Sequence, residues 1–304
     1  MRKLEPIKDD AMTFISNVIA SSSKKGRNNE ESKSETKEFR DFCSTVVSEN
    51  EQTIKQYDKD FEANTLEDLE NKGQLNNDEK DFFLSLYSFR KKAISQLRET
   101  VLTEKGFRND ICPLCECDTV TTMDHYLPKE KYALFVVHPR NLIPCCNSCN
   151  QHKSDNVFKD GKRVFWNCYL DNPVDKQYLK CEITKRENGL IDVEFTIDKS
   201  ELSEQEACVI ENTLGSDGQN VIGQYKKMVG NEIIILVKRI SGLMMNGDQF
   251  ADSIRKIKET DLSHCIMNDW RDVLENALLN SNDFLNFAKK ESEKNIEKSK
   301  LDKN

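Results

Sequence analysis

The spacing of apolar residues predicts helices through the first 105 residues of the chain. Apolar residues between positions 14 and 19 fall on one side of a short helix, and the same periodicity between positions 38 and 105 predicts three or four more helices. Asn76 begins an Asn-Asn-Asp sequence that suits the N-terminal cap of a helix running through Tyr87. Residues 21–37 contain no apolar side chain, so we expect a flexible loop there.

The pattern of apolar residues changes after position 105. Short runs rich in proline and cysteine come first. Residues 164–197 then favour strands, with a hairpin turn at Asn188-Gly189 and an alternating strand over residues 191–197. Helical spacing returns after residue 200, where the apolar run Ile233–Val237 predicts a buried helix. The charged tail over residues 289–304 is expected to fray.

Together these patterns predict an α+β fold in four regions. A helical N-terminal region covers residues 1–105, a small cysteine-rich core covers 106–165, a strand-rich extension covers 166–200, and a helical C-terminal region covers 201–304. The longest apolar run is five residues, far below the roughly 18 that a membrane helix needs, so no membrane association is expected. The first residues develop no apolar stretch typical of a secretory signal, which makes the cytoplasm the expected location.

Charge is unevenly distributed along the chain. The net charge of −8 argues against a protein that coats nucleic acid without specificity. Residues 120–165 nevertheless carry seven lysines and arginines against four aspartates and glutamates. A locally basic window suits a small phosphate-binding site, although chance produces such windows as well.

Cysteines are concentrated in the predicted core. Six of the eleven fall between Cys112 and Cys149, and four of these form two Cys-x-x-Cys pairs, Cys112 with Cys115 and Cys146 with Cys149, separated by 30 residues. Two such pairs can aim four thiolates at one ion, so the sequence predicts a structural zinc site with no position open for water. Reduced, buried cysteines without metal are the alternative. Cys145 could replace Cys146, but only by breaking the pair spacing.

Three short motifs lie within and beside these cysteine pairs. Asp124-His125 is followed by a proline three residues later, and Asn141 is followed by a leucine. Asn150 comes directly after the second cysteine pair, with Lys153 three residues further on. Each motif alone is weakly specific, whereas the three in this order are specific in combination.

In this combination, the stretch from Cys112 to about Val157 resembles the HNH nucleases, also called the ββα-metal or His-Me finger family. In that family Asp-His lies on one strand, Asn-Leu on a second, and Cys-x-x-Cys-Asn-x-x-Lys opens a helix. The resemblance implies a small zinc-pinned ββα-metal (HNH) core between mainly helical N- and C-terminal regions. The third residue of the family motif is often histidine, whereas the matching position in this chain is Asn150.

The resemblance, together with the needs of phosphodiester hydrolysis, assigns a role to each motif. A histidine can take a proton from water near neutral pH, so His125 is the candidate general base. Asp124 and Asn150 offer the oxygen ligands that Mg²⁺ or Mn²⁺ prefers, and such an ion stabilises charge on the phosphate and on the leaving oxygen. In the family, the middle asparagine orients the histidine loop through hydrogen bonds, and Asn141 matches that position.

Further residues are candidates for contact with nucleic acid, each with a plainer interpretation beside it. Lys153 and Arg140 could contact phosphate, and for Lys153 a structural or solvated role is an equal alternative. His138 is interpreted as a loop or hydrogen-bonded histidine. An isolated Asp124-His125 pair would be interpreted as a surface pair, but its frame of two cysteine pairs favours the catalytic interpretation.

The predicted function is that of a metal-dependent HNH endonuclease that hydrolyses DNA phosphodiester bonds by nicking or double-strand cleavage. One such core cuts one strand, so double-strand cleavage requires a dimer or repeated nicking, and the oligomeric state stays open. Two alternatives remain: a four-cysteine zinc module that binds nucleic acid or protein without cutting, and an RNA-cleaving HNH toxin. Stand-alone HNH proteins of similar layout occur in bacterial defence operons beside an ATPase subunit. That resemblance implies a role in phage defence or restriction and an ATPase partner.

Overall fold

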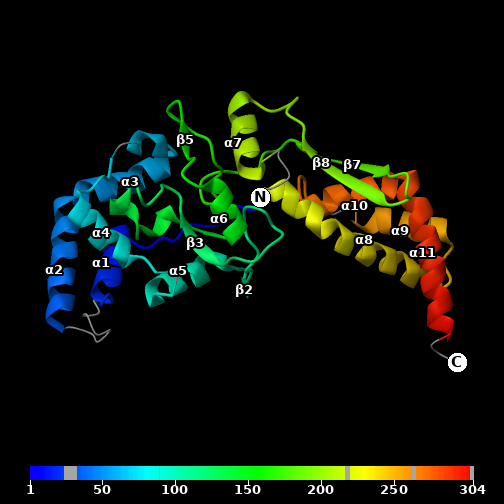
Figure 1. Cartoon of the computed structure of the whole chain (residues 1–304), viewed down its shortest axis with the longest axis horizontal. Coiled ribbons are helices and arrows are strands. Elements are labelled where there is room, and N and C mark those ends of the chain that lie inside the picture. Colours follow the sequence, from blue (N-terminus) through cyan, green and yellow to red (C-terminus); the bar gives the residue numbers. More distant parts are fainter. Residues whose placement is uncertain (24–32, 71, 89, 216–219, 262–264, 302–304) are drawn as a thin grey trace. The chain divides into compact units, whose positions relative to one another are not determined.

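The computed structural model describes the chain except for residues 24–32, 71, 89, 216–219, 262–264 and 302–304. The chain divides into two compact units (Figure 1). The first unit consists of Met1–Pro173 with Cys208–Thr213, and the second consists of Val174–Ala207 with Leu214–Asn304. The N-terminal helices and the cysteine-rich segment therefore belong to one unit. Both units combine helices with small sheets, so the fold is α+β.

Helices make up the N-terminal part of the first unit. These are α1 (Ala11–Ala20), α2 (Lys33–Glu49), α3 (Glu51–Ala63), η1 (Leu66–Leu69, a 3-10 helix), α4 (Asn77–Leu86) and α5 (Lys92–Leu102). The Asp10 carboxylate caps α1 by accepting the Thr13 N–H at 2.8 Å. Helix α4 begins with a capping box in which Asn76 and Glu79 exchange hydrogen bonds, so the predicted cap is confirmed. This box sets where α4 begins, and the helix ends at Leu86 with Tyr87 as its C-cap.

The segment predicted to be a flexible loop is partly helical. Residues 24–32 of that segment lie outside the described residues. Helix α2 begins at Lys33, so the prediction of a loop over residues 33–37 is wrong. Phe39 and Val46 on the apolar side of this helix are buried. Their packing stabilises the helix, so that it can include a first turn made of polar residues. The negative charge of Glu35 in that turn also interacts favourably with the positive end of the helix dipole.

Antiparallel strand pairs and one helix complete the first unit. The pairs are β1 (Thr103–Glu104) with β2 (Phe107–Arg108), β3 (Thr122–His125) with β4 (Leu142–Cys145), and β5 (Phe158–Lys159) with β6 (Lys162–Arg163), and α6 (Asn147–Lys153) lies between β4 and β5. In the second pair, Asp124 stands opposite Ile143. The connection from β3 to β4 contains the 3-10 helices η2 (Ala133–Phe135) and η3 (Pro139–Asn141) and is largely buried, which holds it in one conformation.

The second unit contains the predicted hairpin and a set of helices. Strands β7 (Leu179–Lys185) and β8 (Ile191–Ile197) pair in antiparallel register across the Asn188-Gly189 turn, and residues 164–178 before them form no strand. The helices are α8 (Val221–Met245), α9 (Phe250–Asp261), α10 (Trp270–Asn280) and α11 (Asn282–Leu301), while α7 (Glu204–Leu214) contributes to both units. The core includes Tyr225, whose ring lies 5.7 Å from Phe195 and 5.3 Å from Trp270.

Two predictions for the C-terminal region need correction. In α8, Leu236 and Val237 are buried, but Ile234 is 53% exposed and Ile235 43% exposed. A run of five apolar residues extends around more than one face of a helix, so only part of it can face the core. The prediction that the charged tail frays from residue 289 is wrong as far as Leu301, because α11 continues to that residue and buries Ser292, while residues 302–304 lie outside the described residues. No helix among the described residues has both the length and the apolar character needed to span a bilayer.

Candidate metal centre and adjoining cavity

The four cysteines of the two predicted pairs meet at one point in the first unit. The Sγ atoms of Cys112, Cys115, Cys146 and Cys149 all lie within 4.8 Å of one another, and all four residues are buried. Four sulfurs bound tetrahedrally at about 2.3 Å from one zinc ion are roughly 3.8 Å apart. The Sγ atoms of Cys115 and Cys146 are 3.9 Å apart. The cluster can therefore hold a zinc ion.

Backbone hydrogen bonds aim these sulfurs toward one another. Cys146 is the N-cap of α6, and its sulfur accepts the Cys149 N–H at 3.4 Å. The Cys112 sulfur accepts the Cys146 N–H at 3.3 Å. Such bonds favour the thiolate form that binds metal. The cluster uses Cys146 and not Cys145, which pairs with Thr122 on the neighbouring strand, so the choice left open by the sequence is decided.

Helix α6 also borders a cavity of about 280 Å³ in the first unit. Asp124 and His125 reach this cavity from β3, and Asn150 and Lys153 reach it from α6. The order of strand, strand and helix is the one that the resemblance implies. Four of the candidate site residues predicted from the sequence therefore share one cavity.

His125 is buried and its ring is fixed on two sides. Nε2 lies 2.9 Å from the Val136 carbonyl oxygen. A carbonyl can only accept, so Nε2 carries the hydrogen, and Nδ1 of the neutral ring keeps a free lone pair. Tyr87 packs edge-on against the ring, with ring centroids 4.5 Å apart. Burial lowers the pKa of His125 to about 3, so the ring is neutral at physiological pH.

Asn141 is fully buried and ties together the loop that follows His125. Its Oδ1 accepts the Leu127 N–H at 2.7 Å and the Tyr57 hydroxyl at 3.2 Å. Its Nδ2 donates to the carbonyl oxygens of Leu127 at 3.3 Å and Phe135 at 3.1 Å. Phe135 directly precedes Val136, which orients His125. Asn141 does not line the cavity, and its hydrogen bonds support the loop that positions the histidine.

Asp124 faces the ammonium group of Lys153. Lys153 Nζ lies 3.0 Å from Asp124 Oδ2 and donates to the carbonyl oxygens of His125 at 2.8 Å and Ser154 at 3.3 Å. The side chain of Lys153 is only 1% exposed. Burial raises the pKa of the Asp124 carboxyl, and the positive charge of Lys153 acts in the opposite direction. Lys153 is thus engaged within the site and is not presented at its surface.

Asn150 lies in the middle of α6 and is half-buried beside the cavity. Its N–H donates to the Cys146 carbonyl at 3.0 Å, and the preceding residue is the cysteine-cluster member Cys149. The cysteine cluster and the cavity therefore share one short helix, so any ion held by the four sulfurs also fixes the position of Asn150.

Arg140, a candidate phosphate contact, does not line the cavity. Its Nη1 lies 3.1 Å from both Asp58 Oδ1 and Glu62 Oε1, and its guanidinium stacks 5.1 Å from the centre of the Phe61 ring. The side chain is 15% exposed. Arg140 therefore ties the segment before β4 to α3, because both of its carboxylate partners belong to that helix.

The two remaining described histidines also lie outside the cavity lining. His138 is fully buried, stacks 4.1 Å from the Tyr57 ring, and has a pKa lowered to about 3 by burial. Its Nε2 lies 3.6 Å from an Asp58 carboxylate oxygen. The His152 Nε2 lies 2.9 Å from the Asn212 carbonyl oxygen. Both contacts are structural.

Sequence patterns missed several residues that border the cavity, namely Tyr87, Lys129, Glu130 and Asp155. Tyr87 follows α4, and its hydroxyl donates to the Met123 carbonyl oxygen. Nothing in the sequence near Tyr87 indicates this position, since the contact joins segments 36 residues apart. Of these four residues, Lys129 is the one that the sequence could have indicated, because it directly follows the proline of the Asp-His motif.

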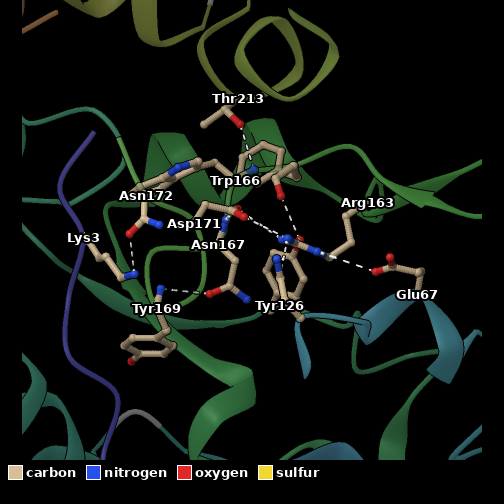
Figure 2. Close-up of polar contacts among 12 residues, drawn as sticks. Lys3, Glu67, Tyr126, Arg163, Trp166, Asn167, Tyr169, Asp171, Asn172 and Thr213 are labelled. Carbon is tan, nitrogen blue, oxygen red and sulfur yellow. Dashed lines mark hydrogen bonds and ion pairs between the residues drawn. The ribbon is translucent and has the colours of Figure 1, made fainter. Parts of the chain in front are cut away.

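A buried polar network around Arg163 holds Tyr126, the residue that follows His125. Figure 2 shows the Arg163 guanidinium among Tyr126, Asp171 and Glu67. Arg163 bonds both oxygens of Asp171, at 2.8 and 3.1 Å, and lies 3.3 Å from the Tyr126 hydroxyl. The Tyr126 hydroxyl in turn donates to the Phe165 carbonyl at 2.8 Å. Because Tyr126 follows His125 directly, this network fixes the end of β3.

Comparison with known proteins identifies two partial similarities. Protein ea31 of Escherichia phage lambda is 24% identical over 185 residues, which cover 59% of this chain and 58% of that protein. Septu protein PtuB of Bacillus thuringiensis is 36% identical over 70 residues, which cover 21% of this chain and 26% of that protein. The chain thus spans little more than half of the first relative and about a quarter of the second. No protein-family model and no solved structure matches the chain.

Proposed function

We propose that this protein is a metal-dependent endonuclease of the HNH type that hydrolyses phosphodiester bonds in DNA. The observation that carries the proposal is the meeting of Asp124, His125 and Asn150 at one cavity, beside a four-cysteine cluster on the same helix. A zinc module that only binds a partner has no need of an acid, a neutral histidine and an amide at one cavity.

His125 is suited to act as the general base. Its Nε2 is occupied by the Val136 carbonyl, so Nδ1 is the nitrogen that can take a proton from an attacking water. The neutral ring has this lone pair available throughout the physiological pH range. Asn141 acts at a distance, because its bonds to Leu127 and Phe135 hold the loop that carries Val136.

Asp124 and Asn150 are the residues that would hold the catalytic ion. A carboxylate and an amide oxygen suit Mg²⁺ or Mn²⁺, and the bound ion would stabilise negative charge on the phosphate and on the leaving oxygen. The buried Asp124 Oδ2 has no hydrogen-bond partner among the described residues apart from the Lys153 ion pair, which fits a carboxylate prepared for a cation. The four-cysteine cluster, with all four positions filled by protein, would hold zinc in a structural role.

The biological setting of the proposal is bacterial phage defence or restriction. It rests on the similarity in layout to stand-alone HNH proteins of defence operons, and the partial similarity to Septu protein PtuB is the comparison that bears on it. An ATPase subunit is the expected partner. The test is affinity capture of the tagged protein from its native cells: recovery of an ATPase supports this setting. No ATPase, together with full-rate cutting by the protein alone, contradicts it.

The nuclease itself is tested by nicking of supercoiled plasmid with Mg²⁺ or Mn²⁺, comparing wild type with His125→Ala. His152→Ala is the matched control, because it removes a histidine of α6 that does not line the cavity. Zinc content is measured in every protein. Cutting that only His125→Ala loses, at equal zinc, supports the proposal. Zinc-loaded wild type, assayed together with its captured partner, that cuts neither DNA nor RNA favours the binding module. Cutting of RNA alone favours the toxin alternative.

A further inference from the structure

The charges around the cavity are nearly balanced within the protein. The charged residues that line it are Asp124, Lys129, Glu130, Lys153 and Asp155. Glu130 also pairs with Lys80 at 3.0 Å, outside the lining. The three carboxylates are thus matched by three ammonium groups, so the cavity offers a divalent cation little net negative charge.

Lys153 differs from the other lysines of this set in its burial. Lys129 is exposed and Lys80 is 30% exposed, whereas Lys153 is 1% exposed and lies 3.0 Å from Asp124 Oδ2. Its remaining hydrogen bonds go to backbone carbonyls of His125 and Ser154. Water screens this ion pair poorly, so the positive charge acts strongly on the carboxylate that would hold the ion.

The backbone at this point shows that Lys153 is held in place. Ser154 ends α6 with φ of 48° and ψ of −133°, an unfavourable conformation for a residue other than glycine. The Ser154 N–H bonds the Asn150 carbonyl at 3.2 Å, and its own carbonyl accepts from Lys153. The chain therefore turns sharply where the ammonium group needs an acceptor.

We propose that Lys153 is a built-in counter-cation that neutralises Asp124, so that tight binding of the catalytic ion depends on the negative charge of an arriving phosphodiester. This inference rests on the proposed nuclease function. Because one carboxylate already paired with an ammonium group and one neutral amide attract a divalent ion weakly, phosphate oxygens supply the missing charge. Ion and substrate then bind cooperatively, because each supplies charge that favours binding of the other.

The proposed role and direct contact of Lys153 with phosphate predict different changes in the affinity for the free ion when the charge of Lys153 is removed. If Lys153 only contacts phosphate, removing its charge weakens DNA binding and leaves the affinity for the free ion unchanged. If Lys153 neutralises Asp124, removing its charge strengthens binding of the ion in the absence of DNA. A unit charge beside the ligand of a divalent ion is worth about tenfold in affinity or more, even with strong screening.

The experiment measures Mn²⁺ binding by electron paramagnetic resonance on the full-length, zinc-loaded protein without DNA, at mildly alkaline pH. Lys153→Met should bind Mn²⁺ at least about tenfold more tightly than wild type. Lys153→Arg, which keeps the charge, and Lys159→Met, which removes an exposed lysine of β5 outside the cavity lining, should stay near wild type. An unchanged or weaker affinity in zinc-loaded Lys153→Met overturns the inference.

A second measurement avoids any change at Lys153. His125→Ala, which should not cut, is titrated with Mn²⁺ in the presence and absence of a short DNA duplex. The affinity for Mn²⁺ should rise at least about tenfold with DNA. Equal affinity in both conditions, or tight Mn²⁺ binding by wild type alone, overturns the inference while leaving the nuclease intact. No Mn²⁺ binding by any protein, with or without DNA, overturns the proposed function and this inference together.

Discussion

Replacing Asn141 by alanine should strongly destabilise the first unit around β3 and β4. The substitution leaves the buried Leu127 N–H and the Tyr57 hydroxyl without the acceptor that they meet at 2.7 and 3.2 Å, and removes the donor to two carbonyls. A buried donor without a partner costs about 1–3 kcal/mol. The Tyr57 hydroxyl lies 3.4 Å from the Arg140 carbonyl and keeps a partial acceptor. We therefore expect a loss of about 2–4 kcal/mol.

Hydrogen exchange followed by mass spectrometry measures this effect locally, which matters because the chain contains two units. Peptides covering residues 122–145 should exchange about 30-fold to 1000-fold faster in Asn141→Ala, since each tenfold corresponds to about 1.4 kcal/mol. The same variant should lose nicking activity, because the Val136 carbonyl no longer holds Nε2 of His125 in place.

Asn147→Ala is the matched control. Asn147 is exposed at the start of α6, so its replacement should change stability by less than about 0.5 kcal/mol. If exchange in residues 122–145 rises less than about fivefold in Asn141→Ala, the Asn141 hydrogen bonds do not hold this loop. The support proposed for His125 would then be wrong.

Three more predictions follow from the site. Cys149→Ser should lose the zinc that elemental analysis detects in wild type, whereas Cys145→Ser should keep it, because only Cys149 belongs to the cluster. His138 is neutral in the fold with a pKa of about 3, so the unfolded chain takes up its proton first as the pH falls below about 6.5. Its stabilising contribution is complete above that pH and is lost toward pH 3. Between pH 7 and 5, the stability measured by urea denaturation should fall on the order of 2 kcal/mol more in wild type than in His138→Gln, which keeps the similar contribution of His125. Tyr87→Phe removes the hydrogen bond from the hydroxyl to the Met123 carbonyl, worth about 1 kcal/mol, but keeps the ring against His125. Its nicking activity should therefore stay within about tenfold of wild type. Tyr87→Ala removes the ring as well and should lose nicking activity.

Each of these predictions has an outcome that contradicts it. Zinc retained in Cys149→Ser would show that three sulfurs suffice or that the ion lies elsewhere. Equal pH dependence of wild type and His138→Gln would show that His138 titrates normally despite facing Asp58, Arg140 and Tyr57. Full activity of Tyr87→Ala would show that the ring contact does not position the histidine.

Local patterns were sufficient where neighbours in sequence are also partners in space. The N-terminal cap at Asn76 and the turn at Asn188-Gly189 depend on a few adjacent residues, and both were predicted. Local patterns failed where burial is decided by distant segments. The apolar run in α8 was expected to be buried, but which of its sides meets the core depends on the packing of α10 and α11.

The members of the candidate site can be identified from the sequence alone: two cysteine pairs at metal-binding spacing, and Asp124, His125 and Asn150 in their order along the chain. Spacing within short motifs sets which side chains can converge, and a turn or a helix start suffices to aim them. The protonation and packing of those side chains depend on the tertiary structure. Val136 selects the hydrogen-bearing nitrogen of His125, Tyr87 packs on its ring, and Lys153 is buried against Asp124. The contacts of His125 join segments 11 and 38 residues apart in the sequence, and the effect of Lys153 on Asp124 depends on burial. Short sequence patterns do not reveal such contacts, because the charge and proton affinity of a group depend on all the atoms around it.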